Sequence, residues 1–180
     1  GTYVRLTDRG ISEQTARKYG VRCELNQDGS IAKHIYPYYR DKEIVAFKER
    51  ILGDTGKQNF YSKGNIRDSG LFGENLFQAG GKYITLVEGE CDAMAAYELL
   101  GSKWPVVSIK NGAGGAIKDV KQSLEFLEKF DTVVINFDND KPGRDAAKKV
   151  ARVLSPGKAK IMNLPEDFKD ANDMLRKGSS

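Results

Sequence analysis

The stretch Lys82-Tyr83-Ile84-Thr85-Leu86-Val87-Glu88-Gly89-Glu90-Cys91-Asp92 is an apolar run that ends abruptly in three closely spaced carboxylates. The apolar part predicts a buried strand, and the residues from Asp92 to Leu100 have a helical pattern. The same order recurs downstream, where Thr132–Phe137 predicts a strand that runs into Asp138-Asn139-Asp140. A helical pattern follows there too, at Asp145–Leu154. Strands that alternate with helices predict parallel β–α–β units.

The rest of the chain after Gly81 continues this alternation. Two further strands and two further helices are predicted at Val106–Ile109, Ile117–Phe130, Ala159–Leu164 and Ala171–Arg176, in the order strand, helix, strand, helix. Parallel sheets are covered on both faces, because the crossover helices pack against them. We therefore expect an α/β fold over residues 82–180, with a parallel sheet and helices on both of its faces.

The first 81 residues follow a different pattern. Ser12 is suited to cap a short helix that Gly20 ends. Ile31–Tyr39 and Glu43–Ile51 then alternate polar and apolar residues, as antiparallel strands do. Residues 1–81 are therefore expected to form a small, basic α+β lobe with an antiparallel meander.

The composition limits the class of protein. The 180 residues carry a formal net charge of +4, which is compatible with a polyanionic partner but does not identify one. Two cysteines and a single histidine cannot readily supply the four ligands of a structural zinc site, so no zinc is expected here. No apolar run approaches the length of a membrane span, so no membrane partner is expected. The ends, Gly1 and Gly178-Ser179-Ser180, suggest a fragment of a longer protein.

The acidic strand ends predict a metal site. In open α/β sheets the chemistry gathers at the carboxyl ends of the strands. Carboxylates crowded there repel one another unless a divalent cation neutralises them, and Mg²⁺ prefers such oxygen ligands. Any one of these acids could instead cap a helix, but five of them at two strand ends favour a metal. The five are Glu88, Glu90, Asp92, Asp138 and Asp140.

These segments resemble the Toprim signature, which primases, topoisomerases and some nucleases share. Further segments are similar to the primase domain of the DNA primase-helicases of the T-odd bacteriophages, which are related to Twinkle. They are Leu6–Val21, Val107–Gly112, Phe137–Gly143 and Lys169–Leu175. The resemblance implies a Toprim fold. Two departures from the family pattern stand out: Lys110 replaces a common proline, and Cys91 replaces an aliphatic or aromatic residue.

The resemblance also implies roles for the acids. Glu88 would be the catalytic acid/base near an attacking 3′-hydroxyl. One or two Mg²⁺ ions, or Mn²⁺ in their place, would activate that hydroxyl and offset the charge of the leaving pyrophosphate. Which carboxylate binds which ion stays open. The expected metal ligands are Glu88, Glu90, Asp92, Asp138, Asp140, Asp170 and Asp173.

The basic residues of the first lobe suggest the nucleotide side of the site. Lys48 and Arg50 lie two apart in a predicted strand, so they share a face. The resemblance implies that both contact the triphosphate and take part in catalysis, although a solvated strand face would look the same. Further nucleotide or DNA contacts are expected from Lys57, Lys63, Arg67, Asn111, Gly112 and Lys141.

The leading hypothesis is a DNA primase that makes short RNA primers from nucleoside triphosphates on single-stranded DNA. The alternatives are a Toprim nuclease and a non-catalytic module that binds single-stranded DNA. The implied partners are zinc-binding and helicase domains of the parent chain and the replisome DNA polymerase. The implied location is a phage replisome in the bacterial cytoplasm, or an organelle for a Twinkle-like relative.

Overall fold

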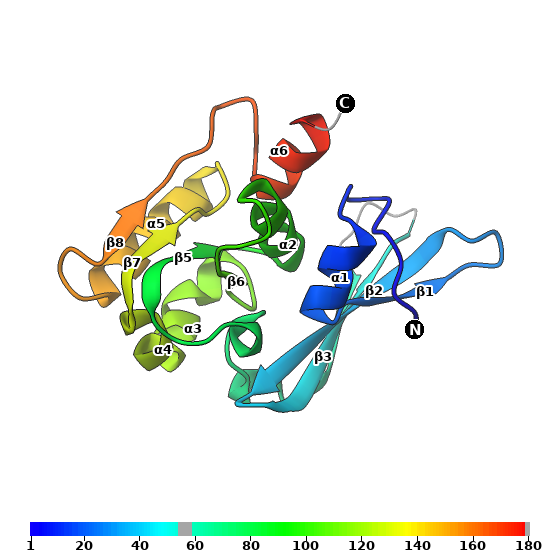
Figure 1. Cartoon of the computed structure of the whole chain (residues 1–180), viewed down its shortest axis with the longest axis horizontal. Coiled ribbons are helices and arrows are strands. Elements are labelled where there is room, and N and C mark those ends of the chain that lie inside the picture. Colours follow the sequence, from blue (N-terminus) through cyan, green and yellow to red (C-terminus); the bar gives the residue numbers. More distant parts are fainter. Residues whose placement is uncertain (54–58, 179–180) are drawn as a thin grey trace.

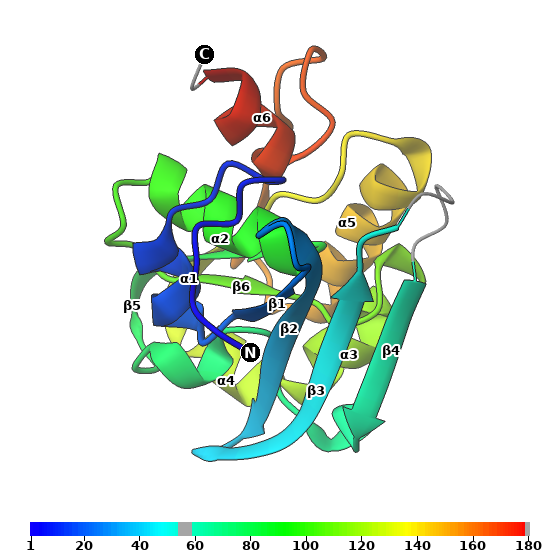
Figure 2. The same cartoon turned by 90° about the vertical axis from the view of Figure 1, so that its right-hand side faces the viewer.

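The computed structural model describes residues 1–53 and 59–178, which form one antiparallel and one parallel sheet of four strands each (Figure 1). The antiparallel sheet has the order β1-β2-β3-β4, and each strand pairs with the next one along the chain. Figure 2 shows β2, β3 and β4 side by side. This sheet is the meander that the alternating sequence predicted. Its strands are β1 (Arg22–Leu25), β2 (Ile31–Arg40), β3 (Glu43–Ile51) and β4 (Asn59–Gly64).

The second sheet is parallel throughout and has the order β6-β5-β7-β8. Helices cover both of its faces, which confirms the predicted α/β architecture. Its strands are β5 (Gly81–Val87), β6 (Val106–Ser108), β7 (Phe130–Ile135) and β8 (Ala159–Ile161). The helices that follow them are α2 (Glu90–Leu99), α3 (Ala116–Gln122), α4 (Leu124–Glu128), α5 (Lys141–Val153) and α6 (Ala171–Gly178).

The short helices of the first half have the expected end signals. α1 spans Glu13–Tyr19, and the hydroxyl of Ser12 accepts a hydrogen bond from the Thr15 N–H, as the cap prediction requires. Gly20 ends the helix with a φ of 71°, a left-handed conformation that favours glycine. Two 3₁₀ turns, η1 (Ile66–Asp68) and η2 (Glu74–Leu76), lie in the segment that connects the two sheets.

Several predicted boundaries differ from the structure, and three of them are instructive. The single helix expected after β6 is broken at Ser123, whose backbone leaves helical geometry. α5 begins earlier than expected, at Lys141, because Asp140 caps it and Pro142 suits a first helical turn. β8 ends at Ile161, three residues before the predicted end. Within the described residues, no helix combines the length and the apolar character needed to cross a membrane.

One apolar core lies between the two sheets and is built around α2. Met94 of α2 and the aromatic residues Tyr36, Tyr38 and Phe72 are all at most 1% exposed in this inter-sheet core. The Phe72 ring lies 5.4 to 5.8 Å from the rings of three tyrosines, Tyr19, Tyr36 and Tyr38. A second core, under α3 and α5, covers the other face of the parallel sheet. The inter-sheet core takes residues from both sides of Gly81, so the division at residues 81 and 82 stays a prediction.

Phe72 is expected to be a main determinant of stability because it joins both halves of the chain. Truncation in Phe72→Ala should lower the free energy of unfolding by about 3–5 kcal/mol, the usual cost of a buried aromatic ring. Urea unfolding followed by circular dichroism measures the change. Leu100→Ala, at a side chain that is 43% exposed, serves as the control and should change it by less than about 1 kcal/mol. Similar losses in both variants would contradict the assignment.

Candidate active site

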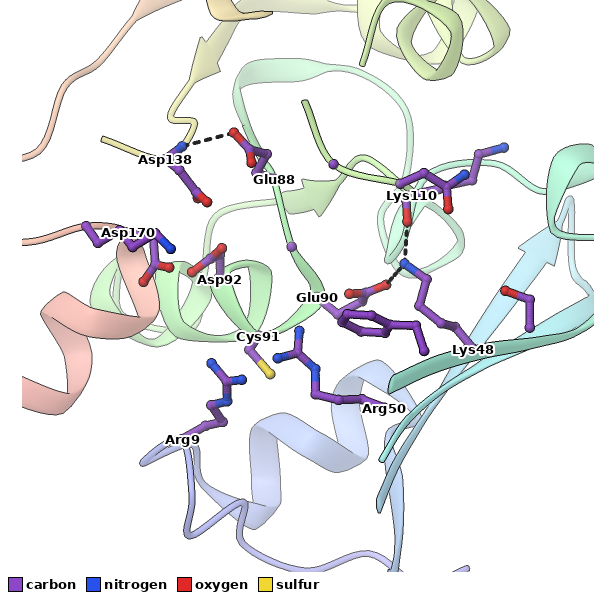
Figure 3. Close-up of a pocket in the computed structure, with 16 residues that line it drawn as sticks. Arg9, Lys48, Arg50, Glu88, Glu90, Cys91, Asp92, Lys110, Asp138 and Asp170 are labelled. Carbon is purple, nitrogen blue, oxygen red and sulfur yellow. Dashed lines mark hydrogen bonds and ion pairs between the residues drawn. The ribbon is translucent and has the colours of Figure 1, made fainter. Parts of the chain in front are cut away.

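The strand order brings the two acidic segments together. β5 and β7 are neighbours in the parallel sheet, so Glu88 after β5 and Asp138 after β7 reach the same edge. Glu88 Oε1 accepts a hydrogen bond from the Asp138 N–H at 3.3 Å (Figure 3). The segment after β7 therefore fixes the direction of the Glu88 side chain.

Three carboxylates from three different elements converge beside Glu88. They belong to Asp92 in the first turn of α2, Asp138 after β7 and Asp170 just before α6. One oxygen of each lies within 4.8 Å of the others, and Figure 3 shows the three side chains pointing toward one another. We call Asp92, Asp138 and Asp170 the aspartate triad.

Hydrogen bonds from neighbouring segments hold the triad in place. Asp92 Oδ1 accepts the Asn172 N–H at 3.1 Å, which ties α2 to the start of α6. Asn139 binds the loop that carries Asp170, because its N–H donates to the Lys169 carbonyl at 2.7 Å. The Asn139 amide also donates to the carbonyls of Leu164, Pro165 and Phe168. Asn139, which lies between Asp138 and Asp140, thus positions the carboxylate of Asp170.

Crowding and burial make the carboxyl groups of Asp92, Asp138 and Glu88 hard to ionise. Burial, together with the charges of Glu88 and Asp170, raises the pKa of Asp138 to about 7. Burial and the charges of Asp170 and Asp138 raise the pKa of Asp92 well above its usual value. Burial also raises the pKa of Glu88. A divalent cation would remove this repulsion, so the triad fits a hard metal ion with oxygen ligands.

Three other acids predicted as metal ligands lie outside the triad. Glu90 is 2% exposed, and its carboxylate forms an ion pair with Lys48 at 2.6 Å. Asp140 caps α5 by accepting the Gly143 N–H at 2.8 Å. Asp173 accepts the Lys169 N–H and pairs with Lys177 at 3.1 Å. The structure thus gives each of these acids another partner.

A cationic wall from the antiparallel sheet faces the acids across a cavity of about 570 Å³. Lys48 and Arg50 of β3 line it, as their shared strand face predicted. The Phe60 ring of β4 lies 4.8 Å from the Arg50 guanidinium and 5.5 Å from the Lys48 ammonium, so it supports both. Arg50 Nε is buried and has no hydrogen-bond partner among the described residues. An anionic ligand in the cavity could supply that partner.

Of the remaining predicted nucleotide contacts, some line the cavity and others lie away from it. Asn111 and Gly112 line the cavity, so the turn after β6 lies beside the site. Lys63 pairs with Glu49 on the exposed sheet surface, and Lys141 pairs with Asp145 on α5. Arg67 is exposed and does not line the cavity. Lys57 lies outside the described residues, so its predicted contact is not tested.

Sequence reasoning missed several residues of the cavity. Arg9, from the loop before α1, reaches it from the opposite end of the chain and donates to Asn172 Oδ1 at 3.2 Å. Lys110, Lys169 and Phe60 also line it. The only signal for Lys110 was its departure from the common proline. Nothing in the local sequence indicates that Arg9 meets a loop more than 160 residues away.

The fold and the acidic strand ends define a Toprim-like domain, and a family model described as Toprim-like matches residues 85–175. The chain is 37% identical over 177 residues to the DNA helicase/primase of Enterobacteria phage T3, covering 96% of this chain and 29% of that protein. It is 28% identical to the Twinkle homolog protein, chloroplastic/mitochondrial, of Arabidopsis thaliana over 93% of this chain and 25% of that protein. The chain thus spans about a quarter to a half of the curated relatives it matches.

A solved structure matches along almost the whole chain. The primase fragment of the bacteriophage T7 primase-helicase is 36% identical, with a TM-score of 0.86, and the match covers 98% of this chain and 70% of that one. The primase of Aquifex aeolicus, at 17% identity and a TM-score of 0.68, shares the fold. The chain therefore belongs to the Toprim-like family and, within it, to the primase domains of phage primase-helicases.

The raised pKa of Asp138 predicts a stability that depends on pH when metal is withheld by a chelator. The folded pKa of about 7 exceeds the ordinary value of 3.8, so the folded state keeps a proton that the unfolded state releases. Stability should therefore fall as the pH rises from about 4 to 7. Relative to wild type, Asp138→Asn should gain thermal stability between pH 5 and pH 8.

Thermal unfolding in a chelating buffer at each pH measures this difference. Asp131→Asn, at an exposed position in β7, is the control and should show the same offset from wild type at each pH. An offset for Asp138→Asn that does not change with pH would contradict the prediction.

Proposed function

We propose that this chain is the catalytic domain of a DNA primase, which joins ribonucleoside triphosphates into short RNA primers on single-stranded DNA. One observation carries the proposal: a triad of carboxylates and a wall of basic side chains face each other across one cavity. A nucleoside triphosphate needs both, because its phosphates bind a metal ion on one side and basic side chains on the other. Hydrolysis of nucleic acid would not need the cationic wall in this form.

The acidic wall supplies the groups for the chemistry. Asp92, Asp138 and Asp170 would hold Mg²⁺, or Mn²⁺ in its place. The bound ion would supply Lewis-acid stabilisation of phosphoryl transfer and lower the pKa of the attacking hydroxyl. Glu88, whose pKa is raised by burial, is suited to accept the proton of the primer 3′-hydroxyl. The hydrogen bond from the Asp138 N–H keeps the Glu88 carboxylate beside the triad.

The cationic wall supplies the groups that bind the triphosphate. Lys48 is already paired with Glu90, so much of its charge is neutralised. Arg50 has an unpartnered Nε and a supporting aromatic ring, and Arg9 enters the cavity from the other side. Both guanidinium groups can bind phosphate oxygens with two N–H donors at once.

The proposed partners are taken by analogy from the relatives. Primase domains of bacteriophage T7 have been observed with the lagging-strand DNA polymerase and an RNA/DNA hybrid, and 86% of such a chain is covered here at 35% identity. We therefore propose that this domain works at a phage replisome in a bacterial host, in contact with a DNA polymerase. Its longer relatives suggest zinc-binding and helicase domains in the same polypeptide.

Primer synthesis can be tested directly with Glu88→Gln. The wild-type chain, incubated with single-stranded DNA, labelled ATP and CTP, and Mg²⁺ or Mn²⁺, should form dinucleotides and longer RNA. Glu88→Gln should reduce the rate at least about 100-fold, because the proton acceptor is lost. Glu125→Gln, at an exposed position in α4, should leave the rate unchanged. Shortened DNA without RNA would indicate a nuclease, and DNA binding without reaction would indicate a binding module.

The assignment of Asp170 rather than Asp173 to the metal can be tested in binding experiments. Asp170→Asn keeps a side-chain oxygen that can accept the Asp173 N–H and cap α6, but it removes one charge from the triad. Mn²⁺ affinity, measured by electron paramagnetic resonance, should fall at least about 10-fold. Asp173→Asn removes the same charge from the same segment and should change the affinity less than about 2-fold. Equal losses in both variants would refute the triad assignment.

A further inference from the structure

Lys110 is a buried lysine at the end of β6, and its side chain leaves the parallel sheet. It is 3% exposed, and its ammonium donates to the carbonyls of Ser69 at 2.7 Å and Ile66 at 3.2 Å. The same ammonium donates to Gln122 Oε1 at 2.9 Å, and the Gln122 amide donates to the Arg67 carbonyl at 2.7 Å. Lys110 therefore fastens the η1 segment to the turn between β6 and α3.

Lys48 crosses the same interface in the opposite direction. It extends from β3, and its ammonium donates to the Lys110 carbonyl while it pairs with Glu90 (Figure 3). The backbone carbonyl of Lys110 thus accepts a hydrogen bond from the cationic wall, at Lys48. Its side-chain ammonium donates hydrogen bonds to the η1 segment. We call this pair of opposed contacts the lysine clasp.

The η1 segment, which Lys110 holds, is attached to the sheet that carries the cationic wall. The η1 segment is hydrogen-bonded to the antiparallel sheet at both ends, because the Asn65 N–H donates to the Val45 carbonyl and the Gly70 N–H to the Tyr39 carbonyl. Movement of η1 would therefore be passed to β3, the strand that carries Lys48 and Arg50. The clasp fixes how far this strand stands from the acidic strand ends.

The Lys110 ammonium is held between the η1 segment and α3. Its ammonium bonds to carbonyl and amide oxygens, which carry no formal charge. Among the described residues, no carboxylate lies within ion-pair distance of that ammonium. The hydrogen bonds of this ammonium therefore serve to hold the η1 segment in place.

We infer that Lys110 is a positioning residue for the nucleoside triphosphate: it sets the spacing of the cationic wall. This inference rests on the proposed function. The triad and Glu88 are held by bonds that do not involve the clasp. Loss of Lys110 should therefore weaken triphosphate binding and leave the chemical step largely intact.

The test compares Lys110→Met with Lys118→Met, which removes the same charge from an exposed site on α3. Primer synthesis at varied ATP should show a KM about 10-fold higher for Lys110→Met, with kcat changed less than about 3-fold. Lys118→Met should change neither by more than about 2-fold. Lys110→Arg keeps the charge and several donors and should recover a substantial part of the KM effect.

A second measurement does not depend on turnover. The dissociation constant of ATP in the presence of Mg²⁺, from isothermal titration calorimetry, should rise about 10-fold in Lys110→Met. Gln122→Leu removes one acceptor of the clasp at an exposed position, so the protein should remain folded even where Lys110→Met unfolds. It should raise the dissociation constant by about 2- to 5-fold.

The outcomes separate the two proposals. A lower unfolding temperature with unchanged KM and unchanged ATP affinity in the folded variants would overturn the positioning role. A loss confined to kcat would overturn it as well. Absence of RNA synthesis by the wild-type chain would refute the proposed function, while the ATP-binding comparison would still decide the role of Lys110.

Discussion

The mutual repulsion of Asp92, Asp138 and Asp170 is the constraint on which the site depends. Three carboxylates whose oxygens approach within 4.8 Å would separate if each were free to move. Each is anchored to a different element, and the hydrogen bonds of Asn172 and Asn139 tie those elements together. Packing of α2 in the inter-sheet core holds Asp92 in place and so offsets the free-energy cost of the carboxylate repulsion. A preformed set of ligands binds a cation without first having to reorganise.

The first turn of α2 links this site to the rest of the fold. Successive residues of a helix point about 100° apart, so Glu90, Cys91 and Asp92 face three different directions. Glu90 meets Lys48 of the antiparallel sheet, and Asp92 joins the triad. Cys91 points into the inter-sheet core, where its sulfur lies 3.4 Å from the Tyr36 hydroxyl. One helical turn thus fixes the cationic wall, the core and the metal ligands relative to each other.

The sequence predicted the architecture well because strand ends and helix patterns are local features. The neighbouring acidic ends at Glu88 and Asp138 follow from strand alternation and the family motif together. The partner of each acid did not follow, since Glu90 and Asp92 differ only by the direction in which a helix presents them. The same holds for Asp170 and Asp173, of which only the first joins the triad. Contacts between distant segments, such as those of Arg9, leave no pattern in the local sequence.

The acidic and cationic walls face each other across the cavity, and the charges of Lys48 and Glu90 are paired with each other. Lys48 and Glu90 neutralise each other at the base of the cavity and hold the walls together. Among the described residues, no lysine or arginine forms an ion pair with a triad carboxylate, so the charge of the triad is left for a cation. Arg50 Nε has no hydrogen-bond partner among the described residues, so it is left to donate to an anion. A complex of a divalent cation with a triphosphate carries both charges on one ligand, and it would satisfy both walls at once.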